Sequence, residues 1–251
     1  MKILISNDDG VNAPGIQALN DALSQRHETI IVAPDRNRSG ASSSLTLDNP
    51  IRLSKLSDNI FSITGTPADC IHIARSQIFH EQLPDLVVCG INMGANLGDD
   101  VIYSGTVAGA IEGAFLGVPA IAVSLVNAKR DYLAHAAETT LRLIENGVHE
   151  DLMRHQILNI NFPNLPATDI KGFKVSRQGH RHRDNVIITD KDPKGKKIFW
   201  LGPQLKGQSA VKGTDFEAIE AGYISITPLR VDLTADAAFD TLNKKMQELN
   251  E

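Results

Sequence analysis

Two adjacent carboxylates, Asp8 and Asp9, stand where the first apolar run of the chain stops, in the stretch ILISNDDGVN. Neighbouring aspartates repel each other, and a bound cation is the simplest way to offset that repulsion. Asn, Asp and Gly are also common turn residues, so the same stretch suits a tight turn after a strand. These residues alone leave the turn and the functional site equally open.

Polar residues also follow two later apolar runs. Ser39 lies in PDRNRSGASSS after the run TIIVAP, and Asn92 and Asn96 lie in CGINMGANLG after the run LVV. Carboxylate, hydroxyl and amide oxygens are hard ligands that suit Mg²⁺ or Mn²⁺, with water completing an octahedron. No pair of His or Cys in the sequence has the spacing of a zinc site. If the three loops meet, the sequence predicts a magnesium or manganese site.

A further motif, Ser104, Gly105 and Thr106, opens the stretch SGTVAGAIEGAFLG, which has a helical pattern. The first backbone N–H groups of a helix and the positive end of its dipole together form an anion site, which could hold a phosphate. Alternatively, Ser104 only caps the helix and the glycines let it pack closely on a sheet. A cation on one side and a phosphate on the other would suit metal-assisted attack on a phosphate ester.

The elements that would position these residues follow from the apolar pattern of the first half of the chain. Apolar runs of strand length alternate there with longer segments of helical pattern. The runs are apolar throughout, as in a parallel sheet covered by helices on both faces, so we predict a three-layer, doubly wound, Rossmann-like α/β fold. In such a sheet the loops after the strands meet at one edge. The expected strands are 2–6, 29–34, 86–91 and 120–125, and the expected helices are 14–24, 106–117 and 132–146.

The second half of the chain has a different pattern, which begins near residue 157. Short strands and a hairpin are expected there, followed by a polar, amphipathic C-terminal helix. We expect one domain over 1–251, with a sheet core over 1–156 and a C-terminal part over 157–251. The stretch 171–200 holds nine Lys or Arg and three Asp, although the whole chain has a net charge of −5. This stretch is either a solvated hairpin or an arm, at about 171–201, that reaches a partner subunit.

Several other classes of protein are disfavoured. The sequence contains no GxxxxGK[ST] and no GxSxG, and Gly10 stands where an aspartyl-phosphate phosphatase needs its second Asp. GINMGANLG is a poor dinucleotide motif because Asn replaces the second Gly. The acidic balance and the lack of a recognition motif disfavour specific nucleic acid binding. With no leader and no apolar run of 18 residues, we expect a cytoplasmic protein that does not enter membranes.

Several uncommon stretches occur in order and together resemble the SurE family of stationary-phase survival proteins. They are ILISNDDGVNAPGI, IVAPDRNRSGASSSLT, GTPADC, CGINMGANLGDDVIYSGTVAGA and GYISITPL, and they span residue 1 to about 230. The resemblance implies a metal-dependent nucleotidase, a phosphoric monoester hydrolase that acts on nucleoside 5′- and 3′-monophosphates. Some members of the family also hydrolyse short polyphosphate.

Site residues carry over from the family position by position. The resemblance implies one divalent cation per subunit, Mg²⁺ or Mn²⁺, and Asp8 and Asp9 as the catalytic residues. It also favours a homodimer or homotetramer formed through the C-terminal arm. Two alternatives stay open: a non-catalytic protein that senses nucleotide or metal, and a phosphodiesterase. The implied metal ligands are Asp8, Asp9, Ser39 and Asn92, and the implied phosphate-binding residues are Ser104, Gly105 and Thr106, with Asn96 close by.

Overall fold

The computed structural model describes residues 1–127, 130–181, 187–201 and 211–250. Its strands are β1 Lys2–Ser6, β2 Glu28–Pro34, β3 Leu53–Ser57, β4 Ile60–Ile63, β5 Leu86–Asn92, β6 Ala120–Leu125, β7 Gln156–Phe162, β8 Phe173–Val175, β9 Ile187–Lys191, β10 Lys197–Leu201 and β11 Ile224–Arg230. Its α-helices are α1 Pro14–Leu23, α2 Pro67–Gln77, α3 Gly105–Phe115, α4 Leu133–Glu145, α5 Asp215–Glu220 and α6 Asp236–Asn250. Short 3₁₀ helices are η1 Gly98–Tyr103, η2 Arg130–Tyr132 and η3 Ala167–Asp169.

Nine strands form one sheet in the order β3-β4-β2-β1-β5-β6-β7-β11-β8. Strands β4, β2, β1, β5, β6 and β7 run parallel, whereas β3 is antiparallel to β4 and β11 is antiparallel to β7. The four strands expected in the first half are all present. Their apolar residues are buried because both faces of the sheet are covered.

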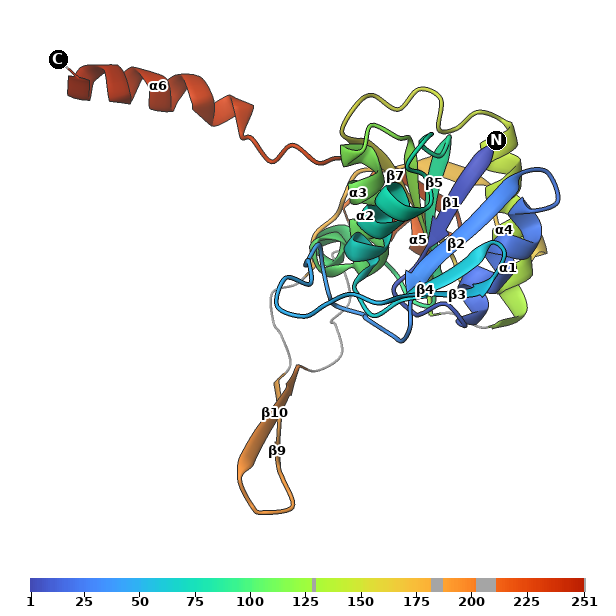
Figure 1. Ribbon diagram of the computed structural model, residues 1–251. Coiled ribbons are helices and arrows are strands. Elements are labelled where there is room, and N and C mark those ends of the chain that lie inside the picture. Colours follow the sequence, from blue (N-terminus) through green and yellow to red (C-terminus); the bar gives the residue numbers. More distant parts are fainter. Residues whose placement is uncertain (128–129, 182–186, 202–210, 251) are drawn as a thin grey trace.

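Helices cover the two faces of the sheet in separate layers (Figure 1). Helices α1 and α4 pack on one face, where Ile16, Leu19 and Leu23 form the apolar stripe of α1. Helices α2 and α3 pack on the other face. The spacing of three and four residues in the stripe of α1 is the reason that this segment forms a helix on an apolar surface. The predicted three-layer α/β fold is confirmed.

Two helices are absent from the sequence-based expectations. Helix α2 begins at a capping box, in which Thr66 accepts a hydrogen bond from the Asp69 N–H and the Asp69 carboxylate accepts one from the Thr66 N–H. The sequence TPAD held this signal, with Pro67 at the first helical position. Helix α5 has only six residues, too few for a periodic pattern to show.

The C-terminal part of the chain contributes both to the sheet and to two outlying elements. Strands β7, β11 and β8 lie within the sheet, so the sheet continues past the expected division at residue 156. Strands β9 and β10 pair only with each other within the described residues, and α6 buries none of its residues. Figure 1 shows this hairpin and α6 extending away from the sheet. Within the described residues, every helix is too short or too polar to cross a bilayer.

Candidate functional site

The stretch NDDG forms a turn that displays both carboxylates. The side-chain oxygen of Asn7 accepts a hydrogen bond from the Gly10 N–H (3.1 Å), and the Asn7 amide donates to the Gly10 carbonyl (2.9 Å). Gly10 has a φ of +105°, which favours glycine. The turn and the functional site are therefore compatible, because the turn places Asp8 and Asp9 side by side just after β1.

Asp8 is almost fully buried, with 3% of its surface exposed. Burial raises the pKa of its carboxyl and the charge of Asp9 raises it further, whereas hydrogen bonds from Thr106 oppose the shift. Burial also raises the pKa of Asp9, opposed by a hydrogen bond from the Met93 N–H (3.1 Å). Within the described residues, neither carboxylate forms an ion pair with Lys, Arg or His. Two buried like charges of this kind call for a cation.

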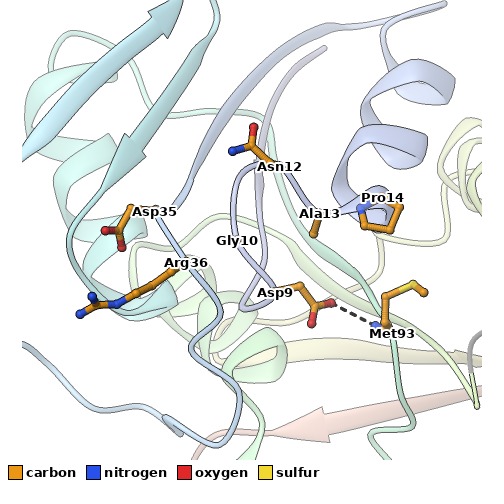
Figure 2. Close-up of a pocket in the computed structure, with 8 residues that line it drawn as sticks. All are labelled: Asp9, Gly10, Asn12, Ala13, Pro14, Asp35, Arg36 and Met93. Carbon is orange, nitrogen blue, oxygen red and sulfur yellow. Dashed lines mark hydrogen bonds between the residues drawn. The ribbon is translucent and has the colours of Figure 1, made fainter.

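Backbone contacts join the other two polar loops to this turn. The Arg38 N–H donates to the Asp8 carbonyl (2.7 Å), which brings the neighbouring Ser39 to the site. The Met93 N–H bonded to Asp9 is the next residue after Asn92, as Figure 2 shows for Met93 and Asp9. The Asn92 amide nitrogen donates to the Gly94 carbonyl (2.9 Å), which leaves its oxygen as the atom that could coordinate a cation.

The order of the strands explains why these three loops meet. Strand β1 lies between β2 and β5. The chain passes from β1 outward to β2, β3 and β4, and then returns to the other side of β1 as β5. This reversal is a topological switch point, where the loops after adjacent parallel strands separate and leave a crevice. The candidate site lies at this crevice.

The N-terminus of α3 closes one side of the site. Ser104 caps the helix, because its hydroxyl accepts a hydrogen bond from the Val107 N–H (3.1 Å). The Thr106 hydroxyl donates to the Asp8 carboxylate. Gly105 packs directly on Asp8, since a Cβ on Gly105 would lie 2.7 Å from the Asp8 Cβ. The expected anion-binding end of α3 therefore touches the carboxylate pair.

Asn96 lies in a buried cluster of amides that fixes the loop after β5. Its side-chain nitrogen donates to the Ser124 hydroxyl (2.8 Å), and its backbone N–H donates to the Asn161 side chain (2.9 Å). Its carbonyl accepts from the side chains of Asn159 (2.8 Å) and Asn161 (3.0 Å). The amide of Asn96 thus holds the loop to β6 and β7. The sequence carries a sign of this cluster, because Asn159 and Asn161 alternate within an apolar strand.

Sequence reasoning missed a group of contacts that ties the base of the hairpin to the site. The buried Asp215 accepts hydrogen bonds from the Gly98 N–H (2.7 Å) and the Gly179 N–H (2.9 Å). Arg181 pairs with Asp100, with 2.6 Å between its Nε and the carboxylate. The Arg181 guanidinium also lies 5.0 Å from the centroid of the Phe216 ring, within range of a cation–π interaction. Residues before the hairpin are thereby fixed to η1, which leads directly into Ser104.

Arg181→Ala is expected to lower the free energy of unfolding by about 1–3 kcal/mol, because Asp100 is buried and would lose a charged partner. Chemical denaturation would measure the change. Lys55→Ala is the control, since the Lys55–Asp58 pair is exposed and exposed pairs contribute about 0–1 kcal/mol. Equal effects of the two substitutions would show that the Arg181 pair does not hold the base of the hairpin.

Comparisons with known proteins agree with this geometry. A family model described as "Survival protein SurE" matches residues 3–185. The "5'-nucleotidase SurE" of Vibrio cholerae serotype O1 is 52% identical over 248 residues, which cover 99% of this chain and 98% of the relative. The protein of the same name from Nitrosococcus oceani is 51% identical over 249 residues, with 99% of both chains covered.

A solved structure supports the same relationship. The crystal structure of the SurE protein from Aquifex aeolicus superposes with a TM-score of 0.87 at 40% identity, and the match covers 100% of both chains. With the family model, the relatives and this structure in agreement over nearly the whole length, the chain belongs to the SurE family.

Proposed function

We propose that this protein is a 5′-nucleotidase that releases inorganic phosphate from nucleoside 5′- and 3′-monophosphates and depends on one divalent cation, Mg²⁺ or Mn²⁺, per subunit. The carrying observation is the buried pair of Asp8 and Asp9 against the N-terminus of α3, in a chain 52% identical to proteins named 5′-nucleotidase. Short polyphosphate is a further candidate substrate, because it presents the same terminal phosphate.

The donor atoms at the site suit a hard divalent cation. Asp8, Asp9, Ser39 and Asn92 offer two carboxylates, one hydroxyl and one amide oxygen, and their loops are joined by the backbone contacts described above. The pKa of both carboxyls is raised by burial, which shows that the ionised pair lacks compensation within the described residues. A bound cation would supply that compensation, polarise the phosphate and make a bound water more acidic.

The chain itself positions the phosphate and handles the proton. Backbone N–H groups at Ser104, Gly105 and Thr106 bind the phosphate oxygens, helped by the positive end of α3. Asp8 is held by Thr106 and is almost fully buried, whereas Asp9 borders an open cleft. Asp9 is therefore the carboxylate that the attacking water reaches, and it accepts the proton of that water. Asn96 acts from a distance by fixing the loop after β5.

The direct test is release of inorganic phosphate from a panel of nucleoside 5′- and 3′-monophosphates with Mg²⁺ or Mn²⁺, with and without a chelator. Phosphate release that the chelator abolishes is the expected result. Nucleotide binding without phosphate release would instead support a sensor. Cleavage of an oligonucleotide without free phosphate would identify a phosphodiesterase.

The hairpin of β9 and β10 is proposed to be an arm that joins subunits into a homodimer or homotetramer. Isolated two-stranded hairpins are only marginally stable in water, and contiguous exposed apolar surface marks interaction sites. Phe199, Trp200 and Leu201 are 65%, 59% and 87% exposed, and Ile187 and Ile188 on the paired strand are also exposed. A second subunit would bury these side chains.

Deletion of residues 187–201, with a short Gly-Ser connection, is expected to lower the molecular mass in solution to that of one chain. The thermal midpoint of the sheet domain should change little, because the hairpin is a separate two-stranded sheet. Light scattering and thermal unfolding would measure both quantities. The control replaces the turn residues Lys194 and Lys196 by Ser, which removes charge but keeps the apolar strands. An unchanged mass after the deletion would exclude the arm as the subunit contact.

A further inference from the structure

An open cleft of about 440 Å³ borders the Asp9 carboxylate on the side away from α3 (Figure 2). Its lining includes Asp9, Asn12, Pro14, Asp35, Arg36 and Met93. The volume falls in the range of small-molecule sites, about 300–1,000 Å³. The metal ligands and phosphate-binding residues proposed above need no such space, so the cleft requires a separate explanation.

The walls of the cleft come from the loops at the switch point and differ in character. Pro14, at the start of α1, and Met93, just after β5, give an apolar surface on one side. Asp35 and Arg36, just after β2, give charged groups on the other side, and Figure 2 shows the two sets on opposite sides of the Asp9 loop. An apolar surface facing a few polar groups is typical of sites for small organic molecules.

A nucleoside combines the two kinds of chemistry that the cleft offers. Its base has flat apolar faces that pack on aliphatic and thioether groups, and Met adapts to such irregular surfaces. Its sugar has hydroxyls, and a carboxylate beyond the end of a sheet strand commonly accepts hydrogen bonds from ribose hydroxyls. Asp35 occupies such a position directly after β2, with its backbone N–H bonded to the Ile63 carbonyl (2.8 Å).

The placement of the cleft relative to the carboxylates gives the direction of the substrate. Asp8 touches Gly105 and Thr106 at the N-terminus of α3, whereas Asp9 borders the cleft. A phosphate bound between α3 and the carboxylate pair therefore has its ester group on the cleft side. We propose that the cleft binds the nucleoside of a nucleoside monophosphate, with sugar hydroxyls on Asp35 and the base against Pro14 and Met93. This inference rests on the proposed function for the phosphate half of the substrate.

Three phosphate esters separate the cleft from the catalytic site. A nucleoside 5′-monophosphate has sugar and base, ribose 5-phosphate has the sugar alone, and methyl phosphate has neither. Asn12→Trp fills the cleft from an exposed position and is expected to raise KM about tenfold or more for the nucleotide, with KM for methyl phosphate unchanged. Asp35→Asn is expected to raise KM several-fold for both sugar-containing substrates and to leave methyl phosphate unchanged.

The matched control is Asn146→Trp, at the end of α4, where the adjacent Glu145 pairs with His27 and not with any residue of the cleft. It should leave all three KM values unchanged. Equal losses on the three substrates in Asn12→Trp would overturn the proposal, because they would mean that the catalytic loops had moved. Unchanged KM values for every substrate in both cleft variants would also overturn it.

A binding measurement keeps the cleft testable even if no phosphate is released from any ester. Adenosine and uridine, which lack the phosphate, should bind to the unmodified protein in a calorimetric titration and should bind at least about tenfold more weakly to Asn12→Trp. Binding of nucleoside without catalysis would contradict the proposed hydrolysis but support the cleft. Phosphate release with equal nucleoside affinity in both proteins would support hydrolysis and contradict the cleft.

Discussion

Asp9→Asn is expected to reduce metal-dependent phosphate release by about a hundredfold or more while the protein stays folded. Removal of one carboxylate weakens cation binding and takes away the proposed proton acceptor. The fold should survive because Asp9 is only half-buried and an amide can keep the hydrogen bond from the Met93 N–H. Colorimetric phosphate assays and circular dichroism would measure activity and fold.

The same substitution should change stability with pH in a defined direction. Burial raises the pKa of Asp8 and Asp9 above the ordinary value of 3.8, so the folded state holds protons that the unfolded chain has lost. The free energy of unfolding therefore falls as pH rises from 3.8 through the folded pKa values. Metal-free Asp9→Asn lacks one of these groups and relieves the other of a like charge. It should be more stable than the metal-free parent at pH 7, with the difference vanishing below about pH 3.8.

Denaturant unfolding in chelator at pH 7 and at pH 3.5 would measure this difference. Asp21→Asn, on the exposed face of α1, is the matched control and should change neither activity nor the pH dependence. Full metal-dependent turnover in Asp9→Asn would refute the proposed site. Equal stability of the two metal-free proteins at pH 7 would refute the account of the uncompensated carboxylates.

Gly105→Ala is expected to lower kcat/KM by about a hundredfold, because the added Cβ would lie 2.7 Å from the Asp8 Cβ and 3.2 Å from its Cγ. Either Asp8 or the N-terminus of α3 must move to relieve this contact. A displacement of about 1 Å at a catalytic group is enough for such a loss. Steady-state kinetics would measure kcat/KM, and titration of the metal-binding heat would show whether Asp8 still ligates.

Gly94→Ala provides the control for an added methyl group in a loop of the same site. The nearest atom to its Cβ would be the Asn92 side-chain nitrogen at 3.6 Å, an ordinary contact. This variant should keep its activity within about twofold, because nothing has to move to make room. Equal activity in the two variants would mean that α3 and Asp8 are not packed as closely in the working enzyme as they are in the structure.

Local sequence determined the elements and the candidate residues. Continuous apolar runs predicted β1, β2, β5 and β6, because residues buried on both faces of a sheet must all be apolar. The stretch NDDG predicted both a turn and a carboxylate pair, and the structure contains both. The Ser104 cap was readable as well, since a Ser before a helical pattern is a local signal. The order of the motifs was enough to indicate the family.

Tertiary structure alone decided how these residues meet. The position of β1 between β2 and β5 makes the crevice, and pairing between strands far apart in the chain leaves no local signature in the sequence. The hydrogen bond from Thr106 to Asp8 and the pair of Arg181 with Asp100 join residues 98 and 81 positions apart. Asn96 was expected beside the phosphate, yet its amide is held by Ser124 on β6, because a buried amide must find partners and the sheet supplies them. Contacts of this kind depend on which elements pack together, a property of the whole fold that no single stretch of sequence contains.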